Sequence, residues 1–185
     1  MKIIKIAAAL ISMFILTACE LHMTPSAPLY SGFKPETDSE YYKMKTQRLV
    51  NDLTRNVYQY EINRVAVIDM TDEEGRVPSL GEYLSDRVIE AITRRKIFRV
   101  AQKGEVREAL HNLNLKPAFV YTRAQVQSIG EALNAQAIIT GMIRDLGANL
   151  DAHLALVDVN TGEVISSTSE KLSRTRYAVE MLHRK

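Results

Sequence analysis

The chain has 185 residues with 24 basic and 22 acidic side chains, a balance that offers no electrostatic basis for binding nucleic acid. It has a single cysteine, which excludes an intramolecular disulfide framework. This length suits one domain with a tether.

Residues 1–18 have the pattern of a signal peptide, with Lys2 and Lys5 before an apolar run from Ile6 to Leu16. That run is too short to span a bilayer, which needs about 20 apolar residues. Removing the segment also removes both lysines, so the remaining 167 residues carry as many basic as acidic side chains. The mature chain is therefore formally neutral.

The apolar run ends in a motif that resembles the lipobox of bacterial lipoproteins, in which a cysteine thiol takes a diacylglyceryl group before cleavage. Cys19 is predicted to be the lipid attachment site, and Glu20, which replaces the aspartate typical of inner-membrane retention, favours the outer membrane. The alternative is an ordinary secretory signal that ends near a cysteine. The motif consists of Leu16, Thr17, Ala18 and Cys19.

Residues 19–39 hold three prolines among Ser, Thr and Gly, which is typical of a flexible tether. About 20 such residues have a root-mean-square span of roughly 25 Å. A domain is then predicted over residues 40–172, beginning with a helix from Glu40 to Tyr60. Tyr41 and Tyr42 are interpreted as covering the edge of a core rather than anchoring in a membrane interface.

A βαβ unit follows. The β-branched run from Arg64 to Met70 predicts a strand buried on both faces. Ser79 and Glu82 have the spacing of a capping box at the start of an amphipathic helix. A second strand is predicted over Ile97 to Gln102.

The second half of the chain predicts two short helices and then a meander. The second helix begins at a capping box formed by Thr122 and Gln125. Gly141, inside a strand from Ala135 to Leu146, indicates a bulge or a close backbone approach. Asn149 to Val159 is the next strand, and Gly162 supplies the left-handed position of the hairpin that follows it. Val164 to Lys171 is a polar outer strand, whereas residues 173–185 form a short helix or a loose tail.

Together these elements predict an α/β fold: a βαβ unit followed by two helices and a three-stranded antiparallel meander, with the helices packed on one mixed sheet.

The sequence gives little sign of chemistry. The turn after the first strand holds Asp69, Asp72, Glu73 and Glu74, which would repel phosphate and lack the spacing of a calcium loop, so we expect a solvated acidic turn. No two histidines have metal-ligand spacing, and there is no nucleophile motif. We therefore predict no catalytic residue, metal ligand or cofactor, and no enzyme activity. The four histidines are His22, His111, His153 and His183.

Several short motifs in order resemble the FlgO domain of flagellar lipoproteins, over about Arg64 to Leu172. They include Arg64 to Asp69, Leu80 to Leu84, Ala137 to Gly141 and Asp158 to Glu163. A related layout occurs in the curli-secretion lipoprotein CsgG and in the amino-terminal domain of TolB. The resemblance implies an outer-membrane lipoprotein with a structural role in flagellum assembly and motility, and no active site. The chain lacks the long amphipathic strands of the secretion relatives.

Three functions stay open at this point. The first is a flagellum-associated structural lipoprotein, with flagellar or envelope proteins as partners. The second is an envelope secretion or assembly accessory of the CsgG kind. The third is a periplasmic ligand-binding module that uses the groove beside the first strand. For the first, we expect a homo-oligomeric ring whose contact includes the outer strand from Val164 to Lys171.

Overall fold

The computed structural model describes residues 38–184, which belong to a compact unit spanning residues 37–185. The predictions for the signal segment, for Leu16 to Cys19 and for most of the tether lie outside the described residues. The elements are α2 (Asp38–Leu53), η2 (Val57–Gln59), β1 (Arg64–Val67), α3 (Ser79–Arg95), β2 (Arg99–Val100), α4 (Lys103–Asn112), α5 (Arg123–Leu133), β3 (Ala137–Asp145), β4 (Asn149–Asp158), β5 (Val164–Ser173) and α6 (Arg176–His183).

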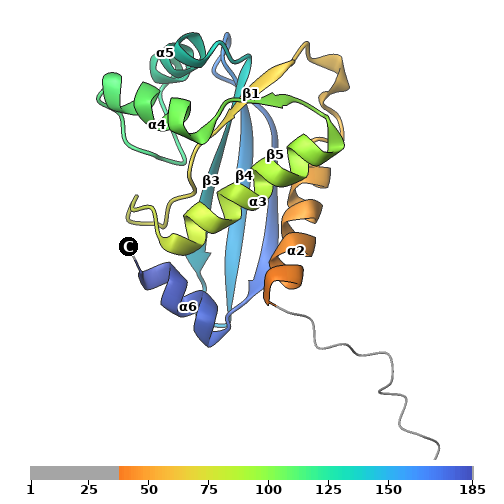
Figure 1. Cartoon of the computed structure of the whole chain (residues 1–185), viewed down its shortest axis with the longest axis vertical. Coiled ribbons are helices and arrows are strands. Elements are labelled where there is room, and N and C mark those ends of the chain that lie inside the picture. Colours follow the sequence, from red (N-terminus) through yellow and green to blue (C-terminus); the bar gives the residue numbers. More distant parts are fainter. Residues whose placement is uncertain (1–37, 185) are drawn as a thin grey trace, which may run out of the picture. The chain divides into compact units, whose positions relative to one another are not determined.

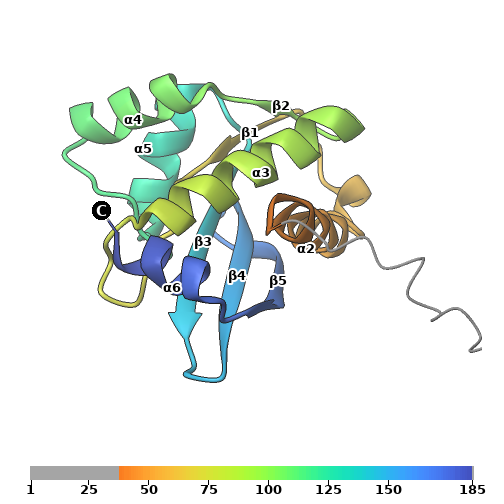
Figure 2. The ribbon, with the colours of Figure 1, turned by 60° about the horizontal axis from the view of Figure 1, so that its bottom comes forward.

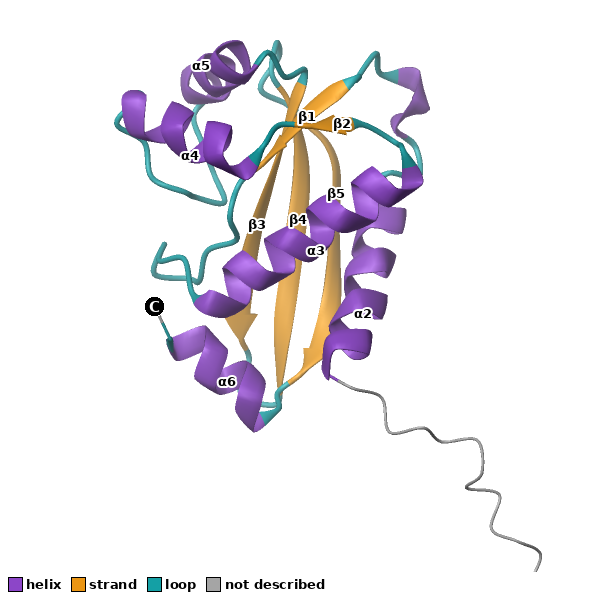
Figure 3. Ribbon diagram, in the orientation of Figure 1, coloured by secondary structure: helices purple, strands orange, loops and turns teal. Residues whose placement is uncertain are grey.

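The strands form one mixed sheet in the order β2-β1-β3-β4-β5 (Figure 3). β1 pairs in parallel with β2 and with β3, whereas β3, β4 and β5 are antiparallel. The βαβ unit is therefore β1-α3-β2, and the meander is β3-β4-β5. The predicted fold class is confirmed.

Helices cover both faces of this sheet. We call the face under α2, α3 and α6 the front face, because α3 crosses in front of the strands in Figure 1. The opposite, back face carries α4 and α5, which lie side by side near β1 in Figure 2. Each face has its own apolar cluster, and the two clusters share only the strands between them.

β1 is buried on both faces, as its sequence predicted. Val65 and Val67 belong to the front cluster, whereas Ala66 and Ile68 belong to the back cluster. Pairing with β3 continues beyond the regular strand, because the Ile68 amide donates to the Ile139 carbonyl at 2.9 Å. A β-branched run therefore suits this strand, since both of its sides pack against other side chains.

The predicted capping box at Ser79 is wrong. Pro78 occupies the N-cap position and makes no side-chain cap, and Ser79 is already helical. The amide of Ser79 instead donates to the Arg184 carbonyl at 2.9 Å, so the end of the chain satisfies a free donor of this helix. The predicted box at Thr122 and Gln125 is confirmed.

Two further strand predictions are refined. The second strand of the βαβ unit is only two residues long, Arg99 and Val100. Gly141 marks a close approach rather than a bulge, because a Cβ there would lie 2.6 Å from the Met70 Cγ. The irregularity falls between Leu156 and Val157 instead.

Residues 173–185, for which a helix and a loose tail were both open, include the helix α6. Its Ala178 and Leu182 are buried in the front cluster. The helix lies across the lower end of the sheet beside the start of α3 (Figure 1), so it is part of the packed domain.

Candidate functional site

The acidic turn after β1 divides into two buried carboxylates, Asp69 and Asp72, and two exposed ones, Glu73 and Glu74. Asp72 is only 6% exposed, and it accepts hydrogen bonds from the Arg76 amide (2.8 Å) and the Arg76 Nε (2.7 Å). Burial alone would raise the pKa of Asp72, but the hydrogen bonds and charge of Arg76 outweigh burial and lower it. The prediction of a solvated turn is therefore wrong for Asp72, although Glu73 and Glu74 are exposed.

Asp69, at the end of the same strand, is also buried. Its carboxylate lies 2.9 Å from the Lys103 Nζ and 3.4 Å from the Arg107 Nη2, both on α4. These ion pairs hold α4 against the carboxyl end of β1, which gives Asp69 a structural role. The prediction of a solvated turn is wrong for this residue too.

The groove beside the end of β1 is small. It measures about 100 Å³, with Asp72 and Glu73 among the side chains around it and Leu182 of α6 at its side. Small-molecule sites usually measure about 300 to 1,000 Å³. The geometry thus gives no support to the ligand-binding hypothesis at this position.

The histidines do not come together in the described part of the chain. His111 and His183 are exposed on separate helices, and His153 lies 2.7 Å from Asp151 on β4. His22 lies outside the described residues. Between residues 38 and 184, no group of three His, Cys, Asp or Glu side chains has the geometry to hold a metal ion.

The most distinctive surface is a groove on the back face, at the half of the sheet that α4 and α5 leave uncovered. We call it the back-face groove. It encloses about 380 Å³ and is lined mainly by apolar side chains from the α4–α5 connection, α5 and the last three strands. Its lining includes Phe119, Val120, Tyr121, Thr140, Val164 and Ser167.

One wall of the groove is held in place by Tyr121. Its hydroxyl donates to the Lys116 carbonyl at 2.8 Å and accepts from the Ala118 amide at 2.9 Å. Burial raises the pKa of Tyr121 to about 12. The connection between α4 and α5 is thereby fixed against its own backbone, and it presents Phe119 and Val120 to the groove.

A hydroxyl without a partner lies in the groove lining. Thr140 on β3 is 1% exposed, and its Oγ1 has no hydrogen-bond partner among the described residues. A buried hydroxyl left unpaired costs on the order of 1–3 kcal/mol. A ligand atom that reaches Thr140 would recover this free energy, which makes the groove a candidate binding site.

The rim of the groove is exposed and apolar. Val120 and Val164 are 77% and 60% exposed, among the few large hydrophobic side chains in that state. Val164 begins β5, whose outer edge has no strand partner, although α2 packs against β5 and its Tyr41 hydroxyl accepts from the Ser173 amide. Along β5, Ser167, Ser169 and Lys171 are exposed, which confirms the predicted polar outer strand.

The sequence did not predict this groove. The connection after Pro117 holds an apolar run, Phe119, Val120 and Tyr121, for which no role was predicted. Thr140 lies inside the strand predicted from Ala135 to Leu146, and no role was predicted for its hydroxyl. Large apolar residues in a loop and a polar residue in an apolar strand were the available signals.

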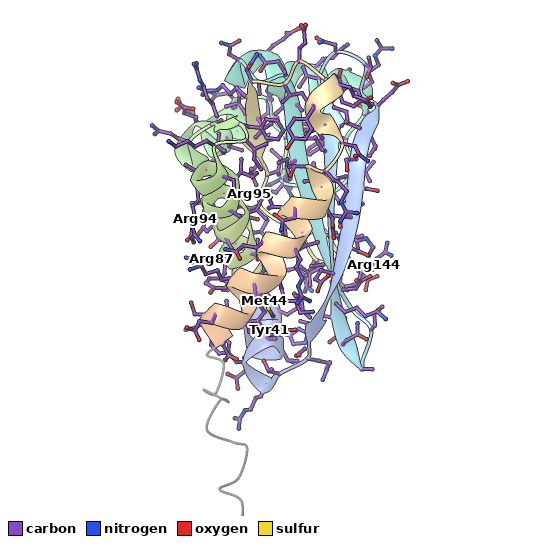
Figure 4. The ribbon with its side chains drawn as sticks, turned by 90° about the vertical axis from the view of Figure 1, so that its right-hand side faces the viewer. Tyr41, Met44, Arg87, Arg94, Arg95 and Arg144 are labelled. Atoms are coloured by element: carbon purple, nitrogen blue, oxygen red, sulfur yellow. The ribbon has the colours of Figure 1, made fainter. Side chains whose placement is uncertain are left out.

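A second, basic surface lies between α2 and α3. Its cavity of about 320 Å³ is lined in part by Asn51, Arg94 and Arg95. Figure 4 shows Arg87, Arg94 and Arg95 on α3, whereas Arg144 lies on the other side of the sheet. Arg94 pairs with Glu90 and Arg95 donates to Asn51, so much of this charge is already satisfied.

None of the described helices is long and apolar enough to cross a membrane.

The fold has known counterparts. The carboxy-terminal domain of LpoB from Escherichia coli superposes with a TM-score of 0.58 at 16% identity, covering 72% of this chain and 98% of that domain. The same domain from Salmonella enterica gives 0.57 at 17% identity, with the same two coverages. The longer LpoB from Escherichia coli gives 0.57 at 15% identity, covering 73% of this chain and 68% of that one.

At these identities the similarity shows the fold alone. No protein-family model and no curated protein sequence matches the chain. The resemblance to the FlgO domain therefore stays a prediction from the sequence motifs.

Proposed function

We propose that this protein is an outer-membrane lipoprotein whose folded domain binds another envelope protein and has no catalytic activity of its own. The observation that carries the proposal is the single cysteine, which follows the apolar run at the fourth position of a lipobox, ahead of a domain with the LpoB fold. Acyl chains on Cys19 would supply the membrane affinity, because each buried CH₂ contributes about 0.8 kcal/mol.

A binding role is supported by the back-face groove. Its apolar rim, its unpaired Thr140 hydroxyl and the free edge of β5 offer contacts of the kind that hold a peptide segment. The paired carboxylates Asp69 and Asp72 are already engaged with basic side chains, so they favour a structural role over an acid–base one.

The anchor is tested by Cys19→Ser in the natural host. We expect the variant to appear in the soluble periplasmic fraction, because the neutral mature chain offers no second insertion signal. The measurement is membrane fractionation with metabolic labelling by a radioactive fatty acid. Thr17→Ala is the matched control, since it keeps a small residue in the motif and should remain labelled and in the membrane.

If Cys19→Ser still sediments with the outer membrane after a high-salt wash, a protein partner and not the lipid holds the chain there. If neither protein takes up fatty acid, the lipobox interpretation fails and the segment is an ordinary secretory signal.

Within this class, we propose the flagellum as the place of action, on the strength of the FlgO-like motifs. A strain without the protein should swim poorly while it still makes flagellin, because the loss is structural and not regulatory. Swimming speed and flagellin amount are the two measurements, with the restored gene as control. Normal swimming would remove the flagellar assignment. A defect in export of an extracellular fibre would favour an accessory of the CsgG kind.

The homo-oligomeric ring stays a prediction. The free edge of β5 is the surface that would make it, since edge strands present unpaired amides and carbonyls to a neighbour. Sedimentation of the Cys19→Ser protein would give its size in solution.

A further inference from the structure

The described domain has one end at which α2, the first of its helices, begins. α2 starts there at Asp38, and its Tyr41 hydroxyl accepts from the Ser173 amide, at the end of β5, at 2.6 Å. The start of α6 and the turn between β3 and β4 lie at the same end (Figure 1, Figure 2). We call this end the lower end, as it appears in Figure 1.

Two exposed apolar side chains flank an ion pair at the lower end. Arg174, just before α6, holds Asp145 at the end of β3 through contacts of 2.9, 3.1 and 3.2 Å. Leu146 follows Asp145 and is 55% exposed, and Tyr177 in the first turn of α6 is 50% exposed. The ion pair therefore fixes the β3–β4 turn beside the start of α6, with Leu146 and Tyr177 at one end of the domain.

The charge left uncompensated at the lower end is positive. Lys43 on α2 and Lys171 on β5 are exposed, and neither pairs with a carboxylate among the described residues. Arg176 begins α6 with a side chain that is 94% exposed, although it pairs with Glu180. The acidic side chains in the first turn of α2 lie where the helix dipole compensates negative charge. A negatively charged surface is therefore complementary to this end.

We infer that the lower end rests on an anionic phospholipid surface, with Leu146 and Tyr177 at the level of the headgroups and Lys171 and Arg176 near the phosphates. Tyrosine is enriched at membrane–water interfaces because its ring is apolar and its hydroxyl is polar. Basic side chains close to an anionic leaflet are attracted to it. The inference rests on the proposed acylation of Cys19, which brings the membrane within reach, and it adds how the domain is oriented there.

The length of the predicted tether makes this contact accessible. Residues 20–37 separate Cys19 from Asp38, and a flexible chain of about 18 residues spans roughly 23 Å. Short flexible linkers hold two groups at an effective concentration on the order of millimolar. A contact too weak to bind the free domain is therefore populated once Cys19 is anchored. The Cys19→Ser protein is still expected in the soluble fraction for the same reason.

This orientation determines where the back-face groove lies. Val164, at the groove rim, and Ser173, at the lower end, are the first and last of the ten residues of β5. At about 3.3 Å per residue they lie roughly 30 Å apart, along the long axis in Figure 1. With the lower end on the lipid, the groove is held away from the membrane and is open to a partner.

The test uses residues 19–185, which contain the whole compact unit. Cys19 is the single cysteine, so its thiol couples the protein to a maleimide lipid in vesicles of equal parts phosphatidylcholine and phosphatidylglycerol. The chain has no tryptophan, so Tyr177→Trp introduces a single fluorophore. We expect its emission at shorter wavelength on these vesicles than in solution, together with quenching by brominated phospholipid.

Tyr58→Trp is the matched control, because Tyr58 is 87% exposed in η2, at the opposite end of the domain (Figure 3). Its emission should be the same on vesicles as in solution. Adding Lys171→Glu and Arg176→Glu to the Tyr177→Trp protein should return its emission to the solution value. Adding Arg99→Glu, on β2 at the upper end, should leave the shift intact.

Unchanged emission of the Tyr177→Trp protein on the anionic vesicles, or an equal shift for Tyr58→Trp, would overturn the inference. An equally large shift on vesicles of phosphatidylcholine alone would overturn the assignment of anionic headgroups. Because the coupling is chemical, neither result depends on acylation of Cys19 in the cell. Fatty-acid labelling tests that acylation separately, so failure of the lipid contact leaves the proposed function standing.

Discussion

At the scale of single residues, burial decides what each carboxylate of the acidic turn does. Asp72 faces inward and receives two hydrogen bonds from Arg76, whereas its neighbours Glu73 and Glu74 face the solvent. Four acidic residues in a short stretch are therefore not equivalent. The effect of changing Asp72, Glu73 and Glu74 together should therefore come mainly from Asp72.

Asp72→Ser should lower the free energy of unfolding by about 1–3 kcal/mol at pH 7, because it leaves the Arg76 hydrogen bonds without an acceptor. The pKa of Asp72 is lowered on folding, so its contribution is present above the ordinary value near 4 and is lost as the pH falls through the lower folded pKa. Urea unfolding at pH 7 and at lower pH measures both effects.

Glu73→Ser is the matched control and should change the unfolding free energy by less than about 0.5 kcal/mol. Its carboxylate is exposed and lies 3.5 Å from Arg144 in a surface ion pair. Equal losses for the two variants would mean that Asp72 is not engaged as described.

At the scale of elements, α6 shows how the end of a chain becomes part of a core. Its Ala178 and Leu182 face the front cluster, and the Arg184 carbonyl accepts from the Ser79 amide at the start of α3. Thr175 is the N-cap of this helix, and its hydroxyl accepts from the Ala178 amide. A short segment with these features closes the lower end of the front face.

Leu182→Ala should lower the unfolding free energy by about 2–5 kcal/mol, because it opens a cavity where α6 meets the front cluster. Tyr177→Ala, on the same helix at a side chain that is 50% exposed, should cost much less. Urea unfolding of both variants checks this difference. Similar stabilities for the two would place α6 outside the cooperative unit.

At the scale of the whole molecule, the sheet couples the two apolar clusters. Val65 and Val67 of β1 pack forward, whereas Ala66 and Ile68 of the same chain segment pack backward. If β1 leaves the sheet, the apolar side chains of both clusters are exposed to water. We therefore expect the described domain to unfold in one transition.

Ile68→Asp should unfold both faces together, because a carboxylate cannot be solvated at a position that is 1% exposed. Hydrogen exchange of amides in α3 on the front and α5 on the back is the measurement, and both should lose protection. Val164→Asp, at an exposed edge position, is the control and should stay folded. Retained protection in α3 alone would show that the faces unfold separately.

Local patterns in the sequence determined the mixed sheet, its βαβ unit and meander, the double-sided burial of β1 and the cap at Thr122. These features follow from side-chain periodicity and from hydrogen bonds between residues close in sequence. The lipobox at Cys19 is likewise a local pattern, and it stays a prediction.

Only the tertiary structure decided the features that depend on distant residues. The start of α3 is capped by Arg184, more than 100 positions away, so no local pattern could show that Ser79 would not cap it. The back-face groove arises because α4 and α5 leave part of a sheet face uncovered, so that Thr140, Phe119 and Val164, from three separate parts of the chain, line one cavity. Which polar atoms remain unpaired depends on packing across the whole domain, and packing is set by contacts that the order of residues does not make visible.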